Sequence, residues 1–318
     1  MLNALGSPYI VDKHYDNACD FIKAISYGGE LYGKFDEHFI FRGHSTDEYQ
    51  LLPSSLRGCL ALDNDTSSTF DSQEVNTLKS FLSTTELIQV QTEYRLLQDF
   101  HNACNLNGLY VPEIESLQKS FYPGVDGEVL LLGGPWLPKS YWELAALAQH
   151  HGVKTRLLDW SHDIYVALYF ASTGVFNDNI DKSERHDMEL WALNIDVVMV
   201  KPTEVPMKIV YPRYHDNEYL CAQKGLFTFW EVDSPSLFTS DGKPNTSLKT
   251  DRASLDVQLS NYLADNSIEK KEYLYHISIP QDSAKDIYHY VEKLGYNAST
   301  LFPGYDGVKR FLDEHKTI

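Results

Sequence analysis

The stretch SYWELAALAQHHGVKTRLLDWSHDIYVALYFAS, residues 140–172, decides the fold because it predicts two helices joined by a short connection. Its first half repeats apolar residues at helical spacing and ends at Gly152, and glycine is the usual left-handed residue after a helix. Ser140 and Glu143 have the spacing of a capping box at the start of this helix. A second helix is expected over residues 161–173, with an apolar stripe for the core and Asp163 among the residues able to cap it.

Polar residues with chemical potential gather around the connection, residues 153–160. Arg156 and Asp159 lie three residues apart there, and they can pair with each other, bind elsewhere in the core or face a ligand. His150 and His151 stand at the end of the first helix, where a positive charge favours the negative end of the helix dipole. The alternative is a site in which one imidazole works as an acid or base.

Outside this stretch, strand and helix patterns are interspersed without strict alternation. This favours an α+β class, a single mixed domain with a central, mostly antiparallel or mixed sheet flanked by helices. Residues 1–37 are expected to form a helical segment packed on a main domain of residues 38–318, with surface insertions near 61–75 and 233–255. The patterns predict strands near 38–42, 188–197, 225–232 and 273–279, and helices near 16–26, 77–105 and 282–294.

The composition of the chain indicates which partners and which cellular compartment are expected. Its formal net charge of −18 disfavours non-specific binding to nucleic acid or to anionic lipid surfaces. The four cysteines form no C-x-x-C pair, which argues against a zinc knuckle and against a disulfide framework and suits a reducing cytoplasm. With neither a signal-peptide pattern nor a run of roughly 18 apolar residues, a cytoplasmic protein without membrane contact is expected.

Three further clusters place polar residues beside glycine. Phe41-Arg42-Gly43-His44 ends the first predicted strand, where a guanidinium can hold an anion and a glycine lets a ligand approach the backbone closely. PSSLR follows at residues 53–57. The other two clusters are QKGLFT at residues 223–228 and LFPGYDG at 301–307, where the glycines predict a loop before the last helix.

Together with the run AQHHGVKTRLLDW at residues 148–160, these clusters resemble the FRG domain, which is named for its Phe/Tyr-Arg-Gly motif. The central run is highly specific, whereas the outer clusters gain weight from their order along roughly residues 38–312. The PSSLR segment departs from the family pattern because its leucine comes one place late. FRG proteins look like components of bacterial and phage conflict systems, including toxins, and some relatives resemble ADP-ribosyltransferases.

The resemblance implies a toxin or anti-phage defence effector that transfers ADP-ribose from NAD to a macromolecular acceptor, either protein or nucleic acid (RNA or DNA). An antitoxin protein is the partner expected for such a toxin. The reaction needs a cation for the substrate, aromatic surface for nicotinamide and a carboxylate for the positive charge on ribose. The residues assigned to catalysis are Arg42, His150 and Asp306, with Glu143 as the other candidate carboxylate. Those assigned to NAD binding are Arg42, Gly43, His44, Arg156, Asp159, Tyr169 and Phe227.

Two other classes of function stay open. A metal-independent nuclease would use the histidines, Arg156 and Asp159 for acid–base chemistry and phosphate stabilisation. A non-enzymatic binding module would keep the same polar residues as a structural network. Tyr169 and Phe170 fall in a predicted helix, whereas one transferase branch carries a Tyr-Phe pair on a strand. No metal site is expected, because the adjacent His150 and His151 cannot both face one ion on a regular helix.

Overall fold

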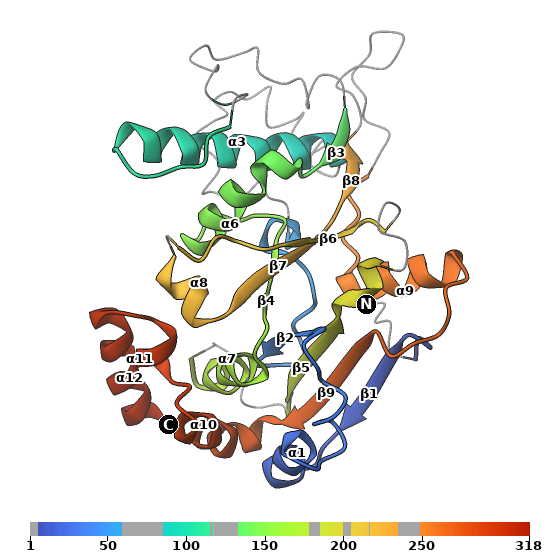
Figure 1. The fold of residues 1–318 in the computed structure, drawn as a ribbon, viewed down its shortest axis with the longest axis vertical. Helices are drawn as coiled ribbons and strands as arrows, with labels where there is room; N and C mark the ends of the chain where they lie inside the picture. Colours follow the sequence, from blue (N-terminus) through green and yellow to red (C-terminus); the bar gives the residue numbers. More distant parts are fainter. Residues whose placement is uncertain are drawn as a thin grey trace.

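The computed structural model describes residues 6–58, 85–114, 117, 133–177, 185–199, 205–215, 217–234 and 249–318. Its main sheet has seven strands in the order β1-β9-β5-β2-β4-β7-β6, and β1 and β9 are its parallel pair (Figure 1). The predicted α+β class with a mixed central sheet flanked by helices is therefore confirmed. The strands are β1 (Ile10–His14), β2 (Phe39–His44), β4 (Leu158–Ser161), β5 (Asp187–Asn194), β6 (Met207–Val210), β7 (Gly225–Trp230) and β9 (Leu274–Pro280). A separate two-stranded sheet joins β3 (Gly134–Trp136) to β8 (Val232–Ser234).

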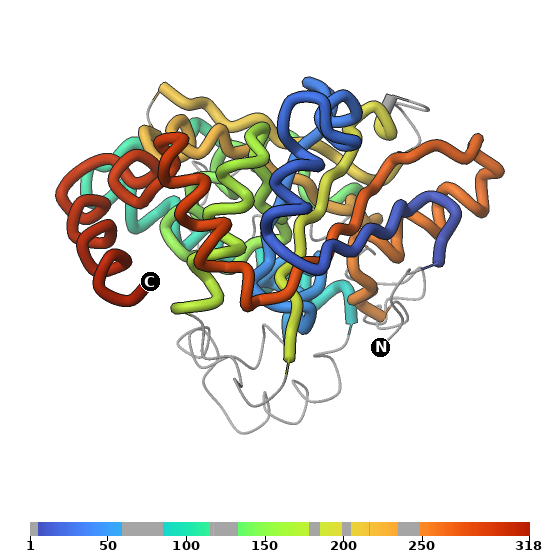
Figure 2. Tube along the Cα trace, turned by 90° about the horizontal axis from the view of Figure 1, so that it is seen from below, coloured from blue at the N-terminus to red at the C-terminus, as the bar shows by residue number. Residues whose placement is uncertain are grey.

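Helices cover the main sheet and extend the molecule on the side of β6 and β7 (Figure 1). Viewed from below, the C-terminal helices lie beside α7, and β1 runs along β9 (Figure 2). The helices are α1 (Ala18–Ile25), α3 (Glu86–Leu106), α6 (Trp142–His150), α7 (Ile164–Asn177), α8 (Glu218–Ala222), α9 (Leu255–Asp265), α10 (Ala284–Lys293), α11 (Ala298–Leu301) and α12 (Tyr305–Thr317).

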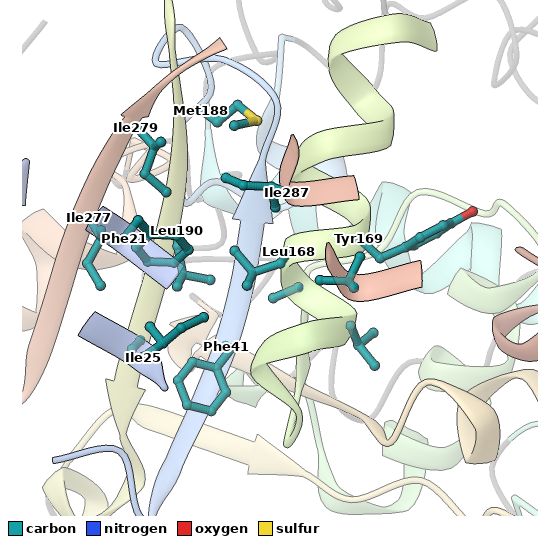
Figure 3. Close-up of a cluster of buried hydrophobic side chains, with 14 of the residues drawn as sticks. Phe21, Ile25, Phe41, Leu168, Tyr169, Met188, Leu190, Ile277, Ile279 and Ile287 are labelled. Atoms are coloured by element: carbon teal, nitrogen blue, oxygen red, sulfur yellow. The ribbon is translucent and has the colours of Figure 1, made fainter. Parts of the chain in front are cut away.

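The largest buried cluster among the described residues joins the sheet to four helices, α1, α7, α10 and α11. Alternate residues of β2, β5 and β9 point toward α7 and meet Phe21 and Ile25 of α1 (Figure 3). Gly43 is part of this contact, because a Cβ at that position would lie 2.0 Å from the carbonyl oxygen of Ala167. The missing side chain therefore lets α7 pack directly on β2.

The main sheet has a waist, which is the place where the neighbouring strands β2 and β4 are paired over a short length, and the candidate site lies there. β2 pairs with β5 along all six of its residues, whereas the pairing of β2 with β4 consists of Phe41 and Ser161. In antiparallel register Arg42 and Gly43 would come next on β2, opposite Trp160 and Asp159, but the strands have separated there. Side chains rather than backbone hydrogen bonds occupy this part of the sheet.

Several local predictions need correction. The capping box is absent, because Ser140 lies in a short 3-10 turn and the N-cap, Tyr141, makes no side-chain cap bond. Residues 158–161 form strand β4 instead of a connection, and the segment before residue 37 adds strand β1 to its helix. Gly307 lies in the first turn of α12 rather than in a loop. The insertion near 61–75 and most of the one near 233–255 lie outside the described residues.

Other local predictions are confirmed. Gly152 follows α6 with a φ of 86°, in the left-handed region that favours glycine. Asp163 precedes α7 and its carboxylate accepts a hydrogen bond from the amide of Tyr165 at 3.0 Å. The helices predicted near 16–26, 141–151 and 282–294 are α1, α6 and α10.

Candidate active site

A pocket of about 670 Å³ opens at the waist of the sheet, where β2 and β4 separate. It draws on every sequence cluster that carried the family resemblance except residues 53–57. Its size is within the usual range for a small-molecule site, about 300–1,000 Å³. The lining residues come from β2 (Phe41, Arg42, Gly43), the end of α6 and the residue after it (Gln149, His150, His151), β4 (Asp159, Trp160, Ser161), α7 (Val166, Ala167, Phe170), α8 and the residue after it (Tyr219, Leu220, Gln223), β7 (Phe227) and the residue after α11 (Phe302).

Arg42 bridges the separated strands from the inner end of the pocket. Its Nη1 donates a hydrogen bond of 2.8 Å to the backbone oxygen of Asp159 and lies 3.5 Å from a carboxylate oxygen of the same residue. Only 16% of the side chain is exposed. Burial lowers the pKa of Arg42 below its usual value while the charge of Asp159 opposes this, and the group still carries its proton at any physiological pH.

Asp159 presents the carboxylate of the pocket. Its side chain is 60% exposed, and one of its oxygens accepts a hydrogen bond of 2.7 Å from Nε2 of Gln149. The Gln149 carbonyl in turn accepts a bond from the hydroxyl of Thr155, which fixes the amide orientation. Among the described lining residues Asp159 is the single carboxylate. The carboxylate is thus accessible to a ligand yet held between a cation and an amide.

A buried series of hydrogen bonds, through His44 and Glu189, fixes Arg42 at its Nε. Nε of Arg42 donates to Nε2 of His44 at 3.0 Å, and Nδ1 of His44 lies 3.3 Å from Glu189. Burial, reinforced by repulsion from Arg42, lowers the pKa of His44 to about 4, although its bond to Glu189 opposes the shift. His44 is therefore neutral, accepts at Nε2 and donates at Nδ1. The other Glu189 oxygen bonds His276 at 2.9 Å, so the arginine is anchored across β2, β5 and β9.

His150 faces the pocket from the end of α6. Burial lowers its pKa below the ordinary value of 6.5, and the neighbouring His151 adds to this effect. The imidazole is therefore mostly neutral at pH 7 and can accept a proton. The ring of Tyr219 lies 5.3 Å away, centroid to centroid, which limits where the imidazole can turn.

Aromatic side chains form much of the remaining wall. Phe170 of α7 and Phe302 approach edge to face with centroids 6.0 Å apart, and Phe227 of β7 is buried at 2% exposure. Gln223 fixes this side of the pocket, since its backbone oxygen accepts from Ser161 at 2.7 Å and its amide donates to the backbone of Leu301 at 3.1 Å. The clusters at residues 223–228 and 301–307 are thereby joined to β4.

The structure places three predicted site residues away from this pocket. Arg156 is buried and paired with Glu86 at 2.6 Å and Glu93 at 2.9 Å, both on α3, rather than with Asp159. Tyr169 is fully buried and belongs to the hydrophobic cluster drawn in Figure 3. Its hydroxyl donates a hydrogen bond of 2.6 Å to Glu314. Asp306 is exposed on the first turn of α12. None of these three residues lines the pocket.

Glu143 and His44 also have defined places. Glu143 accepts a hydrogen bond from Tyr110 at 3.2 Å and lies 3.6 Å from Arg213, at a neighbouring cavity of about 490 Å³. His44 touches a smaller cavity beside the main pocket and supports Arg42 from there. Arg42, Gly43, His150, Asp159 and Phe227 are the predicted residues that line the main pocket together.

Residues that the sequence did not single out complete the site. Gln149 was visible only as a polar residue on the flank of a predicted helix, and its bond to Asp159 depends on the turn at Gly152. Phe170 replaces Tyr169 as the aromatic of α7 because adjacent helical residues point about 100° apart. Within the described ranges, no group of three or more His, Cys, Asp or Glu is arranged to hold a metal ion. No helix described here is long and apolar enough to cross a membrane.

Comparison with known proteins identifies the segment at the centre of this geometry. A family model, the FRG domain, matches residues 135–179, which include α6, β4 and α7. Curated proteins and solved structures gave no match. The matched segment provides Gln149, His150 and Asp159, and its helix α7 packs on the Arg-Gly strand. Residues 135–179 therefore match the FRG domain, the family that the sequence motifs resemble.

Proposed function

We propose that this protein is an ADP-ribosyltransferase that takes ADP-ribose from NAD and transfers it to a macromolecular acceptor, as a toxin or anti-phage defence effector. The observation that carries the proposal is the accessible carboxylate of Asp159, held between Arg42 and Gln149 in a pocket with aromatic walls. The resemblance to FRG proteins of conflict systems supports the biological role.

The proposed substrate pose follows from the chemistry of these groups. Nicotinamide is a flat aromatic ring, and Phe170, Phe227 and Phe302 offer it apolar surface. Arg42 provides the positive charge for the anionic part of NAD, because its Nε and Nη1 are fixed inside the protein. The ribose then lies near Asp159, where a hydroxyl group can donate to the carboxylate.

In the proposed reaction the bond between C1′ of this ribose and the nicotinamide nitrogen breaks. The electron pair leaves with nicotinamide, which becomes neutral, and positive charge develops on the ribose. The Asp159 carboxylate stabilises that charge, and its position is set before the reaction by Gln149 and Arg42. The nucleophile of the acceptor forms the new bond to C1′ and gives its proton to the neutral imidazole of His150.

The nuclease alternative loses one of its required groups. It needs Arg156 to stabilise a phosphate, and Arg156 is buried between Glu86 and Glu93. A binding module without catalysis is the remaining competitor, since the pair formed by Arg42 and Asp159 can also be purely structural.

The test is nicotinamide release from NAD by the purified protein, with a cell lysate supplying acceptors. We expect the wild type to release nicotinamide and Arg42→Ala to release it about a hundredfold more slowly, because the substitution removes a preorganised charge. Arg213→Ala is the matched control, because its guanidinium is 73% exposed outside this pocket. Absence of release from the wild type with protein, RNA and DNA acceptors all present would refute the proposal and favour a binding module.

A further inference from the structure

A second cavity of about 250 Å³ adjoins the candidate active site. The two cavities share Arg42, Gly43 and Phe170, so they meet at the point where β2 leaves the waist of the sheet. A substrate that occupies the main pocket can therefore extend into the second cavity past the same arginine.

Three arginines surround this second cavity. Arg42 comes from β2, Arg57 follows the short 3-10 turn at residues 54–56, and Arg310 comes from α12. The remaining lining residues are His44, Ser45, Tyr49, Phe170, Thr173, Gly174, Asn177 and Gly43, and the described lining contains no Asp or Glu. In a chain with 45 acidic and 27 basic residues, a cavity with three cations and no carboxylate on its wall is a marked local reversal of charge.

All three guanidinium groups are anchored through the same atom. Nε donates to His44 in Arg42 (3.0 Å), to the backbone oxygen of Leu52 in Arg57 (2.9 Å) and to Glu314 in Arg310 (3.0 Å). Arg310 also lies over the ring of Phe302, 4.4 Å from its centroid. A hydrogen bond at Nε fixes the plane of each guanidinium group. The two terminal nitrogens, which form the fork that recognises phosphate oxygens, lie at the other end of the group.

Among the described residues, these like charges are only partly neutralised. Asp159 offsets Arg42 and Glu314 offsets Arg310, whereas Arg57 has no carboxylate partner in the parts of the chain that the structure describes. Arg57 contributes to lowering the pKa of Arg42, as expected for two cations that repel each other across the cavity. His44 is neutral and does not add to the charge. A ligand with two negative charges would relieve this repulsion.

We propose that this second cavity is the diphosphate subsite of the substrate, formed by Arg42, Arg57 and Arg310. The inference rests on the proposed function, because it takes NAD as the molecule that spans both cavities. The nicotinamide ribose lies in the main pocket beside Asp159, and the diphosphate passes Arg42 toward Arg57 and Arg310. Two successive phosphates match a row of forked donors better than a single carboxylate or phosphate does.

The direct test is binding of inorganic pyrophosphate and of ADP-ribose by titration calorimetry. We expect both to bind the wild type, and Arg57→Gln and Arg310→Gln each to weaken binding by about tenfold or more, the usual effect of losing a charged hydrogen bond. Lys309→Gln is the matched control, because it removes the same charge from the same helix at a side chain that is 76% exposed. Arg57→Gln carries the test if Arg310→Gln unfolds the protein through its partner Glu314.

Two results of the binding experiment would overturn the subsite. One is a wild type that binds neither pyrophosphate nor ADP-ribose, and the other is binding that Arg57→Gln leaves at the strength of Lys309→Gln. Nicotinamide riboside, which lacks the diphosphate, should bind the wild type and Arg57→Gln equally. The protein could also bind inorganic pyrophosphate in a way that depends on Arg57 and yet release no nicotinamide. That result would keep the subsite and reject the transferase. Nicotinamide release with an unchanged KM for NAD in Arg57→Gln would keep the transferase and reject the subsite.

Discussion

Arg42 is defined by three partners of different character, and their arrangement determines what its charge can do. Neutral His44 and the backbone of Asp159 fix its orientation, and the Asp159 carboxylate lies at 3.5 Å, too far for a tight hydrogen-bonded pair. A buried arginine with a loosely paired carboxylate is available to an anionic ligand. The same carboxylate remains available to a hydroxyl group in the pocket.

Asp159→Asn is expected to lower the rate of nicotinamide release by about a hundredfold or more, because the amide keeps the shape of the side chain and removes its charge. Asp306→Asn, the matched change at the other predicted carboxylate, should leave the rate within about twofold, since Asp306 is exposed on α12 and lines neither cavity. Single-turnover kinetics with saturating NAD measure both. Equal losses in the two variants would contradict the assignment to Asp159.

The pH dependence of transfer should report His150. A base whose pKa is lowered is neutral, and so competent, above that pKa and becomes protonated below it. Transfer is therefore expected to be flat from pH 7 upward and to fall at pH values below 6.5, approaching tenfold per pH unit on the acid side. A pH profile of kcat/KM measures this limb.

His150→Gln should abolish that acid limb and lower the rate by roughly 10²–10⁴-fold. His151→Gln is the control at the adjacent position and should retain the limb. If the acid limb survived in His150→Gln and disappeared in His151→Gln, the base would be His151 and not His150.

The sequence could predict part of the site and not its pairings. Arg42, Gly43, His150 and Asp159 were predictable because each belongs to a short motif with its own chemical signal. Arg156 was misplaced because an arginine three residues from Asp159 gives no sign that its partners are Glu86 and Glu93, more than 60 residues earlier on α3. Arg310 was missed because a helical Arg and Glu four residues apart look like an ordinary surface pair.

At the scale of elements, the contact between α7 and β2 gives the glycine of the Arg-Gly motif a physical role. Gly43 lines both cavities, yet the neighbour closest to its missing Cβ is the backbone oxygen of Ala167 on α7, not open pocket space. The expected close approach is therefore by a helix of the protein itself. Because α7 also carries Phe170, the packing of this helix sets the width of the pocket.

Gly43→Ala is expected to destabilise the protein by about 1–3 kcal/mol or more, because the added methyl group overlaps α7 and neither backbone can move freely. Gly33→Ala is the matched control, since no atom lies within 4 Å of a Cβ placed there, and its effect should stay within about 0.5 kcal/mol. Urea unfolding followed by circular dichroism measures both. Equal stability of the two variants would show that α7 can shift at little cost.

The buried pairing of Arg156 joins the residues just before β4 to α3. Although burial opposes it, Glu93 and Glu86 raise the pKa of Arg156, so the cation is the stable form. Arg156→Ala leaves two buried carboxylates without their partner, and we expect a loss of about 3–5 kcal/mol in unfolding free energy. Arg213→Ala, at a largely exposed pair with Glu143, should cost less than about 1 kcal/mol. A stable Arg156→Ala protein that has lost nicotinamide release would instead place Arg156 in the reaction.

Elements with long periodic patterns were predictable, and short ones were not. The strand β9 alternates buried and half-buried residues over most of its length, β5 is a run of eight residues that is buried in its middle, and α10 keeps one apolar face. β4 has four residues and sits between two helices, where LLDW reads equally well as a connection. β1 has five residues and β6 has four, and both form strands by pairing at the edges of the sheet.

At the scale of the whole molecule, charge is distributed against the trend of the composition. The chain carries −18 overall, whereas one cavity of the described structure is lined by three cations, Arg42, Arg57 and Arg310. In the proposed complex the diphosphate of NAD occupies those arginines. The three arginines that would attract a nucleic-acid backbone are then occupied by NAD, and the net negative charge of the protein repels nucleic acid.

The acceptor is therefore expected to be a protein. After incubation of a cell lysate with the protein and NAD labelled in its adenylate part, the label should resist nuclease and be released by protease, with at least about tenfold more label in protein than in nucleic acid. A basic target fits best, because long-range attraction by an acidic protein raises the rate at which the two meet. This advantage should shrink through screening as the salt concentration is raised from roughly 50 to 200 mM. Label lost on nuclease treatment would contradict this expectation and would require nucleic acid to reach Asp159 against the overall charge, through local contacts strong enough to overcome it.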